Sequence, residues 1–122
     1  MSDSQIASRA FEFGRRIVKL CDVWVKRGLG GRHIATQLIK CGTLIGANAE
    51  EAEEAQTKAD FIAKLCISRK EARESIYWLK LGVASNVGTS AETVWELDEA
   101  RQLLAMIRSA VLTARTGLDR KP

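Results

Sequence analysis

The only proline of this chain is Pro122, the last of its 122 residues. Proline lacks a backbone N–H and clashes with the preceding helical turn, so it interrupts helices. A chain without internal proline can therefore run long helices without forced breaks. Alanine, leucine, glutamate, lysine and arginine are abundant and favour helix, and no segment alternates apolar and polar residues in the manner of a strand. The sequence predicts an all-α protein.

Three breaks divide the chain into four helical segments. The first, at 27–32, and the last, at 85–90, are rich in glycine or small polar residues, which favour turns. The middle break, at 56–58, is weaker. Thr57 is a candidate N-cap of the helix that follows it, and Ser90 is a candidate N-cap after the last break. The predicted helices cover about residues 4–27, 33–55, 58–85 and 91–117.

Apolar residues recur at alternating steps of three and four in each segment. In the first segment they are Phe13, Ile17, Leu20 and Trp24. This spacing places them on one face of a helix. Four such helices joined by short loops pack antiparallel with their neighbours. The sequence therefore predicts a single domain over residues 1–122, an up-down-up-down antiparallel four-helix bundle.

The first helix carries a second apolar stripe, formed by Phe11, Val18, Cys21 and Val25. A bundle helix needs only one buried face. An extra apolar face indicates either a wider core or burial against another subunit. Of these two alternatives, self-association is the one we expect.

The chain offers few groups for chemistry. Its three cysteines, Cys21, Cys41 and Cys66, lie at or beside apolar stripes and form no C-x-x-C pair, which is typical of reduced thiols in the cytoplasm. The single histidine, His33, excludes the paired Glu-x-x-His motifs of di-iron bundles. We expect no catalytic residues, no metal and no cofactor. The polar N-terminus and the lack of a long apolar run predict a cytoplasmic protein with no membrane partner.

The second helix has two unusual features. Gly42 and Gly46 form a G-x-x-x-G pair in its interior, where glycine costs about 1 kcal/mol relative to alanine, and this favours close approach of another backbone. Asn48 lies on the apolar seam, where an amide either fixes helix register or contacts a ligand. We interpret it as a structural residue.

An acidic cluster ends the second helix and consists of Glu50, Glu51, Glu53 and Glu54. Carboxylates can bind metal, but with one histidine in the chain we interpret them as ion-pair partners of the next helix. The candidate partners are Lys64, Arg69, Lys70 and Arg73.

Basic residues form two rows. Arg101, Arg108 and Arg115 recur every seven residues along the fourth helix, and Arg15 and Lys19 are one turn apart on the first. The formal net charge is +4, which allows an anionic partner without requiring one. Such rows either bind phosphates or make the interhelical ion pairs that are common beside bundle seams.

Two blocks of sequence resemble a known family. Residues 38–52, LIKCGTLIGANAEEA, resemble the R-S-x-S-I-G-A-N-I-x-E-A core of the four-helix-bundle proteins associated with intervening sequences in large-subunit ribosomal RNA genes. Residues 58–79, KADFIAKLCISRKEARESIYWL, are similar to the second block of that family. The chain departs from the family pattern at Cys41 and Thr43, where serine is usual, and at Ala49, where isoleucine is common.

The resemblance implies a four-helix bundle assembled as a ring, a homopentamer, with no family catalytic residues to carry over. A distant relative, the accessory protein of diversity-generating retroelements, binds nucleic acid through a basic barrel. The resemblance also favours a structural role in the bundle for four polar residues of the middle helices, namely Asn48, Glu51, Lys70 and Glu74.

Two functions are therefore open. The first is a non-enzymatic homo-oligomer that binds RNA or a nucleic-acid-associated protein through Arg15, Lys19, Arg101, Arg108 and Arg115. The second is a protein-interaction scaffold without a nucleic-acid role, in which the apolar stripe of the first helix or Trp95 matters more than the arginines. A small-molecule or metal site is a third and weaker hypothesis.

Overall fold

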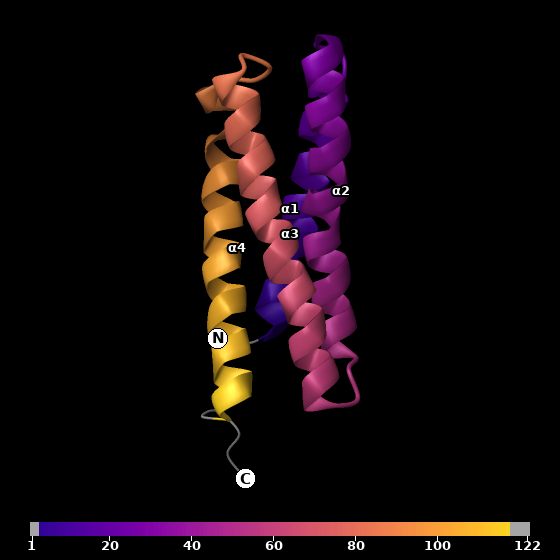
Figure 1. Cartoon of the computed structure of the whole chain (residues 1–122), viewed down its shortest axis with the longest axis vertical. Helices are drawn as coiled ribbons and strands as arrows, with labels where there is room; N and C mark the ends of the chain where they lie inside the picture. Colours follow the sequence, from indigo (N-terminus) through magenta and orange to yellow (C-terminus); the bar gives the residue numbers. More distant parts are fainter. Residues whose placement is uncertain (1–2, 118–122) are drawn as a thin grey trace.

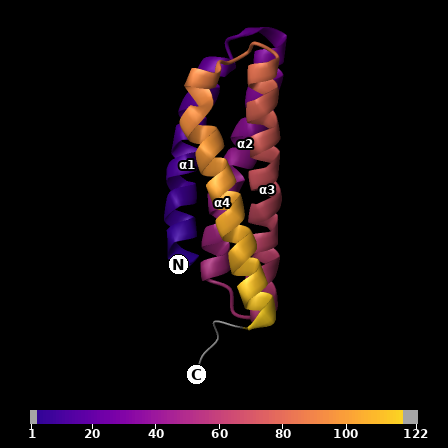
Figure 2. The ribbon, with the colours of Figure 1, turned by 90° about the vertical axis from the view of Figure 1, so that its left-hand side faces the viewer.

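The computed structural model describes residues 3–117, with side chains from residue 5 onward, and forms four α-helices and no strand in this range. Helix α1 spans Asp3–Trp24, α2 Gly28–Glu53, α3 Lys58–Ala84 and α4 Ser90–Thr116. Successive helices run in opposite directions (Figures 1 and 2). The all-α, four-helix prediction is confirmed. The predicted domain also included residues 1–2 and 118–122, which lie outside the described residues.

Each helix packs against two others, because α1 contacts α2 and α4 while α3 contacts α2 and α4. The backbones of α1 and α3, and those of α2 and α4, do not approach each other closely within the described residues. The α1/α2 face and the α3/α4 face therefore lie on opposite sides of the bundle. Figure 2 shows α4 between α1 and α3.

The helix boundaries differ from prediction at the first break. The glycine-rich segment is helical, and α2 begins at Gly28 rather than near residue 33. Gly28 adopts a positive φ of 81°, which favours glycine. A Cβ on Gly31 would overlap the carbonyl oxygen of Trp24. The glycines therefore let the chain reverse within three residues, instead of forming the longer loop that their composition predicted.

Of the two predicted N-caps, one is confirmed and the other is wrong. Thr57 caps α3, and its side-chain oxygen accepts a hydrogen bond from the backbone N–H of Asp60 at 3.0 Å. For α4 the prediction of Ser90 is wrong, because Thr89 is the cap and Ser90 is the first helical residue. Thr89 and Glu92 form a reciprocal capping box, which leaves Ser90 without a capping role.

The core consists mainly of apolar side chains from all four helices. Phe13, Ile17 and Trp24 of the predicted seam are fully buried, and Cys21, which was assigned to the second stripe, is buried with them. Gly42 packs against the side chain of Ile17, and a Cβ on Gly46 would lie 3.2 Å from the backbone of Ala10. The expected use of the glycine pair is confirmed, since it brings α1 and α2 together.

Candidate nucleic-acid interface

The arginine row of α4 lies on the α3/α4 face. Arg101, Arg108 and Arg115 are all exposed. Arg101 lines a groove together with Lys80 of α3, and Nη2 of Arg115 lies 3.6 Å from Sγ of Cys66 on α3. The row therefore lies on the side of α4 that faces α3.

The antiparallel register places a second basic row beside the first. Seven residues along α3 from Lys80 and seven along α4 from Arg101 lead to Arg73 and Arg108, which therefore lie opposite each other. Seven more lead to Cys66 and Arg115, the pair in contact. Because α3 and α4 rise about 1.5 Å per residue, these levels are about 10 Å apart. We name Arg73, Lys80, Arg101, Arg108 and Arg115 the cation ladder.

The positive charges of the cation ladder are not paired with carboxylates among the described residues. All five side chains are exposed, and none of them forms an ion pair within the part of the chain that the structure describes. Among the described residues, the α4 row therefore shows none of the interhelical ion pairs that its alternative interpretation predicted. Sequence reasoning missed Lys80 and Arg73 as members, because only the register between α3 and α4 brings them alongside.

An apolar groove of about 480 Å³ lies at the upper end of the ladder, between Lys80 and Arg101. Val83, Val94 and Leu97 supply much of its wall, and Val94 is 66% exposed. The one carboxylate among the lining residues is Asp98, which accepts a hydrogen bond from Nε2 of Gln102 at 2.7 Å. The groove therefore combines apolar walls with a cation on each side.

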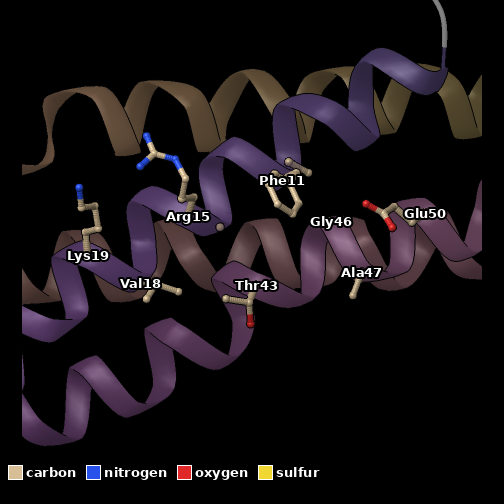
Figure 3. A pocket seen from close by; sticks show the side chains of 10 residues that line it. Phe11, Arg15, Val18, Lys19, Thr43, Gly46, Ala47 and Glu50 are labelled. Atoms are coloured by element: carbon tan, nitrogen blue, oxygen red, sulfur yellow. The ribbon is translucent and has the colours of Figure 1, made fainter.

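Arg15 and Lys19 lie elsewhere, on the opposite side of the bundle. They line a groove of about 570 Å³ between α1 and α2, together with Phe11, Val18 and Gly46. Figure 3 shows them next to each other along α1, with Glu50 at the far end of the groove. The two predicted basic rows therefore lie on different faces of the bundle, that of α1 at the α1/α2 groove and that of α4 at the α3/α4 face.

Arg15 also forms an ion pair within α1. Its guanidinium forms an ion pair with Glu12 at 2.7 Å, one turn away on α1. The hydrogen bond to Glu12 raises the pKa of Arg15 above its ordinary value, and the same bond lowers the pKa of Glu12. Arg15 therefore offers less free charge to an outside anion than the ladder residues do.

The expected polar core lies mostly outside the core. Glu51, Lys70 and Glu74 are exposed, and none forms an ion pair among the described residues, so their assignment as core residues is wrong. Asn48 is half-buried and donates from Nδ2 to the carbonyl oxygen of Leu44 at 2.9 Å. The described residues also show none of the predicted ion pairs between the acidic cluster and α3, and all four glutamates of the cluster are exposed.

Other polar side chains are buried. Oγ of Ser68 donates to the carbonyl oxygen of Ile45 at 2.8 Å, which ties α3 to α2. Oγ of Ser75 donates to the carbonyl oxygen of Glu71 at 2.9 Å and lies 3.3 Å from Sγ of Cys41. Both serines lie three or four residues from the buried Ala72 and Leu79 or Leu65, where only small side chains fit between closely packed helices. Serine at this spacing is the signal that points to a buried hydroxyl.

Three ion pairs hold α1 and the turn after it against α4, and sequence reasoning missed them. The pairs are Arg9–Glu99 at 2.6 Å, Arg16–Glu96 at 3.4 Å and Arg27–Glu92 at 2.9 Å. Arg16 also lies 4.3 Å above the ring of Trp95, an arrangement that attracts a cation to the π face. Trp95, a candidate contact residue of the scaffold hypothesis, is half-buried here and stacks on Phe13.

The described residues contain no group of three or more His, Cys, Asp or Glu side chains that could hold a metal ion. Burial raises the pKa of Cys21 to about 12 and that of Cys41 to about 11, so both stay as thiols at neutral pH. Over residues 3–117, none of the helices is long and apolar enough to cross a membrane.

The fold and these surfaces define a small four-helix-bundle protein whose charged and apolar groups gather on its outer faces. A family model described as 23S rRNA-intervening sequence protein matches residues 2–109, and the chain belongs to this family. The family resemblance of the two middle helices is thereby confirmed. Four members of the cation ladder lie inside the matched range, and Arg115 lies beyond it.

A solved structure supports the same relationship. It is the crystal structure of a protein of unknown function from the S23 ribosomal protein family of Bacteroides thetaiotaomicron VPI-5482. That protein is 34% identical to this chain, with a TM-score of 0.80, and the likeness covers 87% of this chain and 97% of that one. Among curated proteins, none matches the chain.

Proposed function

We propose that this protein is a non-enzymatic bundle that assembles with copies of itself and binds RNA, or a protein that carries RNA, through the cation ladder. The observation that carries the proposal is a row of five exposed cations that form no ion pair with any residue the structure describes. Like charges at neighbouring levels repel one another, and a polyanion laid along them relieves that repulsion and releases counterions. The association of the family with ribosomal RNA supports RNA as that polyanion.

The experiment that tests RNA binding measures affinity for a fluorescent RNA by anisotropy over a series of salt concentrations. The variant Arg101→Glu/Arg108→Glu reverses the centre of the α4 row. It should weaken binding at least about tenfold and reduce the slope of log affinity against log salt by about 1 to 2.

The matched control is Lys26→Glu/Arg32→Glu, which gives the same net charge by changing two exposed residues near the α1–α2 turn. It should bind RNA nearly as the unmodified protein does. Equal losses in both variants would reduce the interaction to net charge alone and contradict the proposed site, as would RNA binding that salt does not weaken.

Self-association is proposed to use the α1/α2 groove. Phe11 is 66% exposed at this groove and Val18 is 38% exposed, and Gly46 leaves part of its floor without a side chain. Arg15 and Lys19 stand along the α1 side and Glu50 at the end, so a second copy can meet both apolar and charged partners. Burial of such exposed apolar area is the main driving force of association.

Light scattering after size exclusion measures this assembly. The family resemblance predicts a mass five times the 13.5 kDa of one chain. Phe11→Asp should lower the mass, whereas Leu29→Asp, which changes an even more exposed apolar residue at the start of α2, should not. A monomer in the unmodified protein would contradict self-association.

The protein-interaction scaffold remains the second candidate because Phe11 and Val18 also suit a different protein partner. If nuclease-treated pulldowns retain a partner that Phe11→Asp loses and Arg101→Glu/Arg108→Glu keeps, the scaffold is the better account. The reverse pattern favours RNA.

A further inference from the structure

Building on the proposed RNA binding, we infer that the α3/α4 face takes an unpaired RNA strand, with one nucleobase in the apolar groove and the neighbouring phosphates on the cation ladder. The proposal concerns the kind of RNA and its mode of binding. It adds the groove walls and Tyr77 to the basic residues already assigned.

The groove suits a flat apolar ring with charged groups on either side. Its volume of about 480 Å³ lies within the range of about 300–1,000 Å³ that is usual for small-molecule sites. Val83, Val94 and Leu97 offer apolar contact, while Lys80 and Arg101 stand one on each helix. A nucleotide matches this arrangement because its base is flat and its backbone is anionic.

The groove opens onto the ladder instead of standing apart from it. Lys80 and Arg101 form both the rim of the groove and the first level of the ladder, and Arg73 and Arg108 form the next level about 10 Å away. A strand whose base enters the groove can therefore continue along the second level. The partner that these charges complement must be extended and anionic.

An aromatic ring on the ridge of α3 supplies a second contact for a base. Tyr77 is 58% exposed and lies in sequence between Arg73 and Lys80. Its ring is nearly perpendicular to that of Trp78, with 5.0 Å between the ring centroids, so Trp78 supports the ring while most of Tyr77 stays open to solvent. Exposed aromatic rings beside cations bind unpaired bases by stacking.

These contacts select against a duplex. In a double helix the bases are stacked and paired inside, so they can enter neither the groove nor the space over Tyr77, and only phosphate contacts remain. An unpaired strand keeps the phosphate contacts and adds the base contacts. The expected difference is about tenfold or more in affinity, since one base on an aromatic or apolar platform contributes about that much.

The test compares three RNA probes of equal length at one salt concentration, namely an unstructured single strand, the same strand with abasic sites, and a duplex. The variants are Val94→Ser, which makes the groove wall polar, and Tyr77→Ser, with Tyr77→Phe as the conservative change. Leu29→Ser is the matched control, because Leu29 is an exposed apolar residue of α2 away from the groove.

The unmodified protein should bind the intact strand about 25-fold to 100-fold more tightly than the abasic strand or the duplex, because both base contacts are lost with those probes. Val94→Ser and Tyr77→Ser should each reduce binding of the intact strand by about fivefold to tenfold and leave the other two probes nearly unchanged. Tyr77→Phe should restore binding, and Leu29→Ser should change nothing.

Equal affinity for all three probes, with loss only in Arg101→Glu/Arg108→Glu, would overturn this inference and leave RNA binding in place. No binding of any probe would contradict the proposed function itself. A change of oligomeric mass in Val94→Ser without RNA would show that a second copy occupies the groove, and would also overturn the inference.

Discussion

Trp24 is among the largest side chains with no exposed surface, and two distant glycines make room for it. Gly82 lies near the end of α3 and Gly88 in the following loop, and a Cβ on either would overlap the indole ring. The loop closes over the ring, because the N–H groups of Val87 and Gly88 both donate to the carbonyl oxygen of Gly82. One residue of α1 thus positions the α3–α4 connection, and with it the upper end of the cation ladder.

Gly82→Ala should destabilise the protein even though alanine favours helix. Helix propensity alone would stabilise by about 1 kcal/mol, but overpacking against Trp24 costs about 1–3 kcal/mol. Gly30→Ala is the matched control in α2, since its Cβ would meet only a side-chain carbon of Val87 at 3.7 Å, and it should stabilise slightly. Urea unfolding measures both free energies, and changes of the same sign in the two variants would contradict the role assigned to Gly82.

At the residue scale, the sequence predicted which side chains fill the core but not how glycines accommodate them. The steps of three and four identified Phe13, Ile17 and Trp24 correctly. The break at 85–90 was predicted only as a turn, because the contact of its Gly88 with Trp24 depends on a partner in another helix. The same limit applies to Glu51, Lys70 and Glu74, whose charges indicated pairing while their helix faces point to solvent.

The weakest packing between neighbouring elements lies between α1 and α4, where charged pairs supplement the apolar contacts. Arg9–Glu99 and Arg16–Glu96 cross the seam, and Arg27–Glu92 closes it at the end where α4 begins. Glu92 serves twice, because it also completes the capping box with Thr89. The start of α4 is therefore fixed both locally and by the turn after α1.

Glu92→Gln should lower the free energy of unfolding at neutral pH and make that free energy depend less on pH in the acid range. The hydrogen bond from Arg27 and then the one from the Thr89 N–H lower the pKa of Glu92 from 4.5 to about 2. Because the folded-state pKa is the lower one, this stabilisation is present above pH 4.5 and is lost as the pH falls toward 2. Glutamine can keep the bond to Thr89, so the loss isolates the pair with Arg27 and should stay below about 1 kcal/mol.

Urea unfolding at several pH values measures this effect. The curves of Glu92→Gln and the unmodified protein should converge toward pH 2, the value that the pKa of Glu92 approaches. Glu12→Gln is the control, because Glu12 pairs with Arg15 within one helix and should change stability less. A constant difference at all pH values would show that the charge of Glu92 contributes nothing.

At the element scale, helix number, direction and most boundaries followed from the missing proline and the apolar spacing. The start of α2 did not, because glycine composition predicts a turn and cannot show that Gly31 packs on the carbonyl of Trp24. The ion pairs between α1 and α4 also could not be predicted from the sequence. Flanking charges are visible in the sequence, but which helix they face depends on the order of helices around the bundle.

Across the whole molecule, that order separates two surfaces that the sequence could not tell apart. Arg15 and Lys19 belong to the α1/α2 groove, and the cation ladder belongs to the opposite face. Seven-residue spacing identified the α4 row, whereas Lys80 and Arg73 became visible only through the α3–α4 register. A molecule with two such separate faces can assemble through the α1/α2 groove and keep the cation ladder for another partner.

An unneutralised basic face should also cost the free protein some stability. Arg108→Gln removes one charge from the centre of the ladder, so it should stabilise the protein by a few tenths of a kcal/mol at low salt, and this gain should vanish at high salt. Arg16→Gln removes an arginine that pairs with buried Glu96 and covers Trp95, so it should destabilise by about 1 kcal/mol or more. Thermal unfolding at two salt concentrations measures both. Destabilisation by Arg108→Gln at low salt would mean that Arg108 has a partner within the bundle. The ladder would then lack the unpaired charge that favours binding of a polyanion.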